Sequence, residues 1–260
     1  MWRQPGHLSF WVLLFVSGLA IQALAQPVLR VRTAAQEDSE PKYVRQAGGV
    51  ARGFCVDLYR AMERADPGLE VAGDQTWKPL RRLEVELRNG QLDLLCGLLS
   101  TQERRTYMVP LQTVIYEVQL RLVVRADDEV VVRNWEDIRS LGPDGVILTS
   151  RGSGYTQRAT ELGGLIVDAN AASSDNNYRR LLAGRGRFYL YRSPGLMDDI
   201  RDHGVEGRVK VLPVVLERQP FYLMVPLSMP EAQRQRLDVA LARVKDDGTL
   251  AQIQQRWLRE

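Results

Sequence analysis

An arginine that follows an apolar run and a turn is the residue of this sequence best suited to hold an anion. Arg104 comes shortly after the run Leu92–Leu99. If that run is a strand of an α/β sheet, Arg104 lies beyond the carboxyl end of the strand, where ligands bind. A guanidinium presents a planar fork of N–H donors that matches a carboxylate with two parallel hydrogen bonds. Because Arg105 is adjacent, a solvated surface arginine is the competing interpretation.

A glycine-containing loop is the second feature with the chemistry of an anion site. Ser153, Gly154 and Tyr155 stand at the expected start of a helix, and amide groups at a helix N-terminus favour negative charge. An ordinary glycine turn is the competing interpretation. The loop lacks the Gly-Lys-Ser/Thr ending of a phosphate-binding loop, and a nucleophilic serine here would have no plausible histidine partner.

Metal binding and acid–base catalysis find little support in the sequence. The chain contains two histidines, His7 and His203, and His7 lies within the N-terminal residues that are expected to be an export signal. Glu103 and Glu117 are available as general acids or bases, but neither has a recognisable partner. We therefore expect no metal and no cofactor.

The N-terminal residues 1–25 have the order of a secretory signal. Arg3 is followed by the uncharged stretch Leu8–Ile21 and then by Ala23-Leu24-Ala25, a small-x-small pattern before Gln26. A membrane anchor is the competing interpretation, but the stretch is shorter than the roughly 20 residues that a spanning helix needs. We expect cleavage near Ala25 and a periplasmic location.

Charge and cysteine content narrow the class of protein. Residues 26–260 carry 34 basic and 32 acidic side chains, which is near balance and argues against binding to nucleic acid. Cys55 and Cys96 are the two cysteines of an exported chain, so one disulfide is expected, with two buried free thiols as the alternative.

Hydrophobic periodicity predicts an α/β layout for the exported part of the chain. Alternating or continuous apolar runs predict strands, and three- and four-residue spacing predicts helices. A first series runs strand, helix, strand, helix, strand up to Leu99, and a second α/β series begins near Gly145. The long apolar run Leu92–Leu99 is typical of a strand buried on both faces of a parallel sheet.

In order and spacing, these elements resemble the family 3 bacterial extracellular solute-binding proteins over nearly the whole exported chain. The resemblance rests on the segments Gly53–Leu58, Trp77–Asp93, Gly97–Arg104 and Asp247–Trp257. It implies a type II periplasmic-binding-protein-like fold with two α/β lobes, each a mixed sheet flanked by helices. Lobe one would contain residues 26–118 and 226–260, and lobe two would contain residues 119–225.

The same resemblance implies a pairing of the cysteines and a set of ligand contacts. Phe54–Met62 and Leu92–Leu99 would lie side by side in lobe one, which favours a bridge between Cys55 and Cys96. Arg104 would clamp the carboxylate of the ligand. The resemblance also implies cleft positions for Gly97, Leu99 and Thr101, and a second grip on the carboxylate from Ser153, Gly154 and Tyr155.

The sequence departs from the family at the position expected to bind an ammonium group. Amino-acid binders usually have an aspartate there, whereas alignment on Gly184-Arg185 places Arg192 at this position. Asp198 and Asp199 are possible substitutes but lie further along the chain. With Arg104 and Arg192 both facing the cleft, we expect a better electrostatic match to a ligand with two anionic groups.

We expect a monomer that binds a small carboxylate-bearing solute and serves the permease of an inner-membrane ABC transporter. Two alternatives remain on the same fold: an enzyme that resembles the dehydratases of prephenate-like substrates, and a sensory subunit for a membrane signalling partner. Fold by itself does not decide between them.

Overall fold

The computed structural model describes residues 1–2 and 28–258. The predicted export signal, its cleavage site included, therefore lies almost wholly outside the described residues. Within the described part of the chain, no helix combines the length and apolar character needed to cross a membrane.

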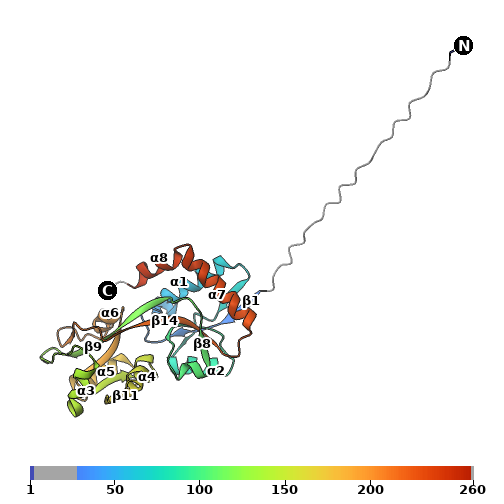
Figure 1. Cartoon of the computed structure of the whole chain (residues 1–260). Helices are drawn as coiled ribbons and strands as arrows, with labels where there is room; N and C mark the ends of the chain where they lie inside the picture. The colour runs from blue at the N-terminus through green and yellow to red at the C-terminus, as the bar shows by residue number, and fades with distance from the viewer. Residues whose placement is uncertain (3–27, 259–260) are drawn as a thin grey trace.

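The chain alternates strands and helices along its length, as the periodicity predicts (Figure 1). The α-helices are α1 (Phe54–Ala65), α2 (Leu80–Arg88), α3 (Trp135–Ser140), α4 (Gly154–Glu161), α5 (Ser174–Leu182), α6 (Leu196–Asp202), α7 (Glu231–Asp246) and α8 (Thr249–Trp257). The strands are β1 (Leu29–Arg32), β2 (Ala35–Gln36), β3 (Val44–Arg45), β4 (Ala51–Arg52), β5 (Leu69–Ala72), β6 (Trp77–Lys78), β7 (Leu95–Leu99), β8 (Met108–Pro110), β9 (Tyr116–Arg125), β10 (Ile147–Ser150), β11 (Val167–Ala171), β12 (Phe188–Ser193), β13 (Val209–Val211) and β14 (Glu217–Pro226).

One mixed sheet runs through the molecule. Its main path has the strand order β11-β10-β12-β9-β14-β7, with β13 paired to β9 and β8 paired to β14. The pairs of β10 with β11 and with β12 are parallel, whereas β12, β9, β14 and β7 pair antiparallel. In Figure 1 the two longest strands, β9 and β14, extend from the part of the fold that carries α1 and α2 toward the part that carries α3 and α5. The smaller pairs β1–β5 and β2–β6 are parallel and belong to the first part.

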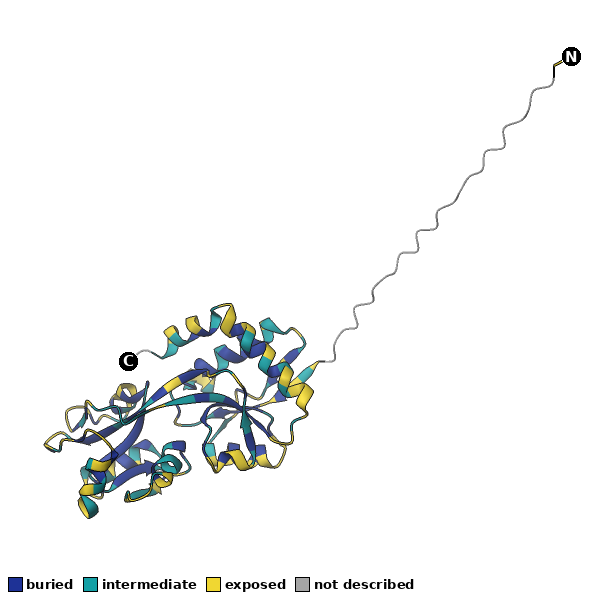
Figure 2. Cartoon of the chain, viewed as in Figure 1, coloured by how far each residue is buried: buried dark blue, intermediate teal, exposed yellow. Residues whose placement is uncertain are grey.

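The apolar core divides into two groups along these long strands. Clusters built from α1, α2, α7 and α8 include Val118 of β9 and Phe221 of β14, whereas clusters built from α3, α4 and α5 include Leu120 and contact Leu216. In Figure 2 much of the sheet is buried, strand β7 throughout, whereas the outer faces of the helices carry most of the exposed positions. The lobe boundaries at 118/119 and 225/226 stay a prediction, although Phe221, which that prediction assigns to lobe two, packs in the cluster of α1.

Strand β7 corrects one expectation. All five of its residues are buried, as predicted, but the strand pairs antiparallel with β14, where Leu99 lies opposite Phe221. Its two faces enter different apolar clusters: Cys96 packs in the cluster of α1, and Leu95 packs in the cluster of α2. The prediction of a parallel sheet at this strand is wrong, because helices on both faces make the run apolar whatever the direction of the neighbouring strand.

Helix α1 is joined to β7 by a covalent bond. Cys55 and Cys96 form a disulfide with their Cα atoms 6.0 Å apart, so the predicted bridge is confirmed. The helix starts after Gly53, whose φ is 126°. A Cβ at this glycine would lie 2.5 Å from the carbonyl oxygen of Lys42, so the chain needs glycine for this close approach.

Candidate functional site

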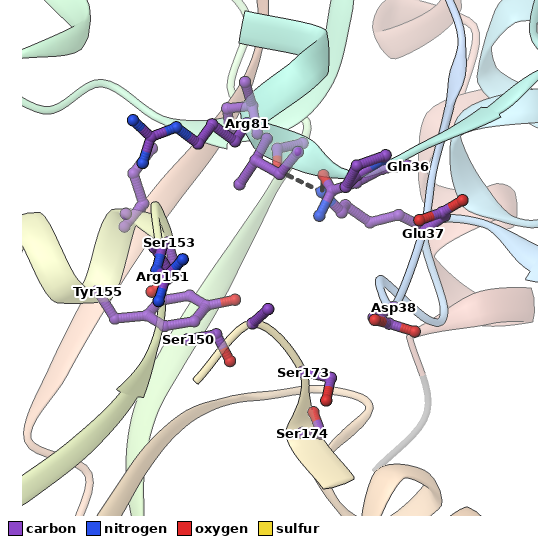
Figure 3. Close-up of a pocket in the computed structure, with 18 of the residues that line it drawn as sticks. Gln36, Glu37, Asp38, Arg81, Ser150, Arg151, Ser153, Tyr155, Ser173 and Ser174 are labelled. Atoms are coloured by element: carbon purple, nitrogen blue, oxygen red, sulfur yellow. Dashed lines mark hydrogen bonds between the residues drawn. The ribbon is translucent and has the colours of Figure 1, made fainter. Parts of the chain in front are cut away.

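A cavity of about 230 Å³ lies between the two groups of core clusters. Figure 3 shows Gln36, Glu37 and Asp38 on one side of the cavity and Ser153 and Tyr155 on the other. The lining includes six of the eight residues predicted from the sequence to contact a ligand: Gly97, Leu99, Arg104, Ser153, Gly154 and Tyr155. Their position at a shared cavity fits the predicted roles, which remain to be tested with a ligand.

Arg104 reaches the cavity with its guanidinium already bound by the protein. Its side chain is 1% exposed. The Nε donates to Glu84 Oε1 at 2.9 Å, and Nη2 lies 2.8 Å from the same oxygen. Nη1 donates to the carbonyl of Leu99 at 3.1 Å, and Nη2 also reaches the carbonyl of Gly152 at 3.5 Å. The expected carboxylate clamp thus already holds an internal carboxylate.

Glu84 is a functional candidate that the sequence reasoning missed. It belongs to α2, whose apolar face carries Leu80, Leu83 and Leu87. The spacing of these residues puts Glu84 on the same face, where a carboxylate needs a buried partner. A charged residue within the apolar face of a predicted helix is therefore the sequence signal that could have identified Glu84.

Lys42 is the second missed residue, and it lines the cavity. Its side-chain amine donates to Gln36 Oε1 at 2.6 Å and to the carbonyl of Gly97 at 3.1 Å. The residue is 2% exposed. Burial, followed by repulsion from Arg192 and Arg104, holds the pKa of Lys42 well below its ordinary value, and attraction to Glu84 opposes this. The sequence offers one hint that Lys42 has a special role: lysine is rare in this chain, with four among 35 basic residues.

The start of α4 forms the opposite wall. The Ser153 hydroxyl accepts a hydrogen bond from the amide of Thr156 at 3.2 Å and so caps the helix. The remaining amides of the first turn have no partner within the helix and favour an anion. A Cβ on Gly154 would lie 2.9 Å from Arg104 Nη1 and 2.9 Å from Leu99 Cδ1, so glycine allows the two walls to meet.

Thr101 and Arg192, also predicted as ligand contacts, do not line this cavity. The Thr101 hydroxyl instead donates to the Gln157 side chain on α4. Arg192, 2% exposed, donates to the carbonyls of Glu40 and Pro194. Both side chains join the two halves of the molecule: Thr101 contacts α4, and Arg192 contacts the loop after β2.

Two acidic side chains that the sequence reasoning did not name, Glu37 and Asp38, lie at the cavity. Glu37 and Asp38 line the cavity and also a neighbouring one of about 320 Å³, which Glu40, Asp199 and Asp202 line as well. Burial, and then repulsion from Asp202, raises the pKa of Glu40. Arg104 is paired with Glu84 and Arg192 is outside the lining, but Arg81 and Arg151 also line the cavity. A ligand with two anionic groups stays a prediction, and the acidic lining makes a zwitterion compatible with the site as well.

The remaining candidates have structural roles or lie elsewhere. Asp199 accepts a hydrogen bond from the Tyr178 hydroxyl at 2.7 Å, and burial raises the pKa of Asp199. Asp198 forms an ion pair with Arg201 in which both side chains are exposed. Tyr191 lines both cavities. In the part of the chain that the structure describes, no three His, Cys, Asp or Glu side chains gather as a metal site would require.

The arrangement is a partly open cavity between two parts that share one sheet. The family model of the bacterial extracellular solute-binding proteins, family 3, matches residues 31–260. The chain belongs to this family. The resemblance seen in the sequence motifs is thereby confirmed, and with it a substrate-binding role. No curated protein sequence matches this family 3 chain.

Solved structures share the two-lobed type II fold of this solute-binding protein. A mutant of ArgBP from T. maritima is 17% identical with a TM-score of 0.70, and the match covers 89% of this chain and 96% of that one. The probable amino-acid ABC transporter extracellular-binding protein ytmK from Bacillus subtilis is also 17% identical with a TM-score of 0.70, covering 89% and 98%. A histidine kinase sensor domain with similarity to periplasmic binding proteins is 20% identical with a TM-score of 0.70, covering 88% and 96%. At these identities the likeness shows the fold alone.

Proposed function

We propose that this solute-binding protein captures a small carboxylate-bearing solute, an amino acid or a related organic acid, in the periplasm and delivers it to the permease of an ABC transporter. The observation that carries the proposal is the cavity between the two core groups, which brings together the side chains of Lys42 and Arg104 and the first turn of α4. Buried cations and helix N-terminal amides are the groups that proteins use to bind carboxylates.

The lining also supports amino acids among the carboxylate-bearing solutes. Glu37 and Asp38 face the cavity from the first half of the molecule, and Figure 3 places both away from Ser153 and Tyr155. An ammonium group near these carboxylates would make up for the aspartate that Arg192 replaces. The predicted signal at residues 1–25 and the family support a periplasmic binding protein, and a monomer is the expected state.

A thermal-shift screen tests the proposal directly. The panel contains the twenty amino acids, dicarboxylates and polyamines, each added to the purified protein without its signal. A solute at a hundred times its Kd stabilises the folded state by about 2.7 kcal/mol, which raises the melting temperature by several degrees. We expect the hits to carry a carboxylate; a response to polyamines alone would contradict the proposal.

A sensory role is the second candidate, supported by the fold shared with a histidine kinase sensor domain. The two roles differ in the partner of the ligand-bound form. A permease gene beside the gene for this protein supports transport, whereas a membrane kinase gene beside it supports sensing.

For the enzymatic alternative, incubation of the pure protein with prephenate should leave the compound unchanged if the protein only binds solutes.

A further inference from the structure

We infer that Lys42, rather than Arg104, is the cation that binds the carboxylate of the ligand. This inference rests on the proposed function and names the residue that performs it. It starts from the positions of the charges around the cavity, because a buried charge is stable only when it is paired or hydrogen-bonded.

Arg104 has its counter-charge within the protein. The ion pair with Glu84 is enclosed, with the two side chains 1% and 9% exposed, and the arginine also donates to two backbone carbonyls. A ligand carboxylate at Arg104 would either displace Glu84 or approach its negative charge in a low-dielectric setting. Displacement of Glu84 and approach to its charge are both unfavourable. The guanidinium of Arg104 is therefore poorly placed to bind the carboxylate of the ligand.

Lys42 is in the opposite situation. Its amine is held by two neutral oxygens, of Gln36 and Gly97, and no carboxylate lies within ion-pair distance of it among residues 28–258. An ammonium has three donors, so one remains for the cavity that the residue lines. The side chain is held over Gly97, where a Cβ would lie 2.5 Å from Lys42 Cδ.

A buried polar group without a hydrogen-bond partner lies beside Lys42. The Tyr116 hydroxyl is buried and has no hydrogen-bond partner among the described residues. The Cβ position of Gly97 is 3.1 Å from this hydroxyl and 2.5 Å from Lys42 Cδ, so the phenol and the lysine lie side by side. An anion at Lys42 would supply the negative charge that the lysine lacks, close to a buried hydroxyl that has a hydrogen bond to donate.

Proton binding should accompany ligand binding at Lys42. The charged or titratable groups around it are Arg192 and Arg104, which repel the ammonium, Glu84, which attracts it, and the phenol of Tyr116. A carboxylate beside Lys42 stabilises the ammonium form and raises the pKa of the lysine. Above the pKa of the free site, binding therefore takes up a proton, and affinity falls as pH rises until the pKa of the bound state is reached.

Calorimetric titration with matched probes tests the inference. L-Arginine, L-glutamine and succinate are each compared with the corresponding amide that lacks a charged carboxylate: argininamide, glutaminamide and succinamide. The proteins are the wild type, Lys42→Met, the pair Glu84→Met/Arg104→Met, and Lys210→Met as the matched control. Lys210 forms an ion pair with Glu129 on the outside of the molecule, with the lysine side chain 38% exposed.

We expect the wild type to prefer a carboxylate probe over its amide, and Lys42→Met to lose roughly ten- to a hundredfold of that preference. The double variant should lose less, and Lys210→Met should match the wild type. Titrations of the wild type in two buffers of different ionisation enthalpy should show proton uptake within the range of pH 6 to 10 that Lys42→Met lacks. Because this readout uses the wild type, it tests the inference even if Lys42→Met fails to fold.

Two outcomes would overturn the inference, and they differ from failure of the proposed function. Retention of the carboxylate preference in Lys42→Met, with its loss in the double variant, would return the clamp to Arg104 and leave the proposed function intact. Carboxylate binding by the wild type without proton uptake at any pH between 6 and 10 would also remove Lys42 from the site. If no carboxylate probe binds the wild type at all, the proposed function itself fails.

Discussion

At the scale of single residues, the buried pair of Arg104 and Glu84 should have the largest effect on stability. Glu84→Met leaves a guanidinium that is 1% exposed without its counter-charge, which should lower the free energy of unfolding by about 3–5 kcal/mol. Glu84→Met/Arg104→Met should recover most of this loss, because apolar side chains can replace a buried ion pair at little cost. Urea denaturation followed by circular dichroism measures both changes.

An exposed pair provides the control for this comparison. Arg30 and Glu70 lie 3.4 Å apart with side chains 68% and 49% exposed. Glu70→Met should change the unfolding free energy by less than about 1 kcal/mol, because water screens the interaction. Equal losses in the single and double variants at Glu84 would show that packing, and not charge, dominates at this site.

At the scale of elements, the disulfide fixes α1 against β7. Cys55 and Cys96 are 41 positions apart, and closure of a loop of this length stabilises a protein by about 4 kcal/mol in the chain-entropy model. Cys55→Ser/Cys96→Ser should therefore unfold at lower urea concentration, and reduction of the wild type should have a similar effect. Identical midpoints for the oxidised wild type and the double variant would contradict the prediction.

At the scale of the whole molecule, closure depends on the contact between the start of α4 and the end of β7. Besides the contacts of Thr101 and Arg104, the Gln157 side chain donates to Glu103 at 2.7 Å, and the amide of Gln102 donates to Glu161 at 3.1 Å. Gly154→Ala would place a methyl group 2.9 Å from Arg104 Nη1. We expect it to weaken ligand binding on the order of tenfold, because the closed state becomes less populated.

Small-angle scattering and titration measure the two sides of this prediction. With ligand present, Gly154→Ala should keep a larger radius of gyration than the wild type. The control is Gly163→Ala, just beyond the other end of α4, where a Cβ meets nothing within 4 Å. Its φ of +67° makes alanine unfavourable there by about 1 kcal/mol, without an effect on closure. Equal affinities for the two variants would show that closure does not depend on this contact.

The sequence determined the class of protein and most of its elements, because these depend on local patterns. Periodicity predicts α1, α2 and the buried strand β7, and the order of the motifs identifies the family over residues 31–260. Six of eight candidate site residues line one cavity, because their positions follow from turns at the ends of strands and helices.

Only the tertiary structure decided which charged side chains are paired within the protein and which can bind a ligand. The sequence shows Arg104 in the right place but does not show that Glu84, twenty positions earlier, occupies its guanidinium. It likewise gives no reason to place Lys42 inside the cavity or Arg192 outside its lining. Pairing of charges depends on distances between segments far apart in the chain and on the exclusion of water around them, and neither can be read from local spacing.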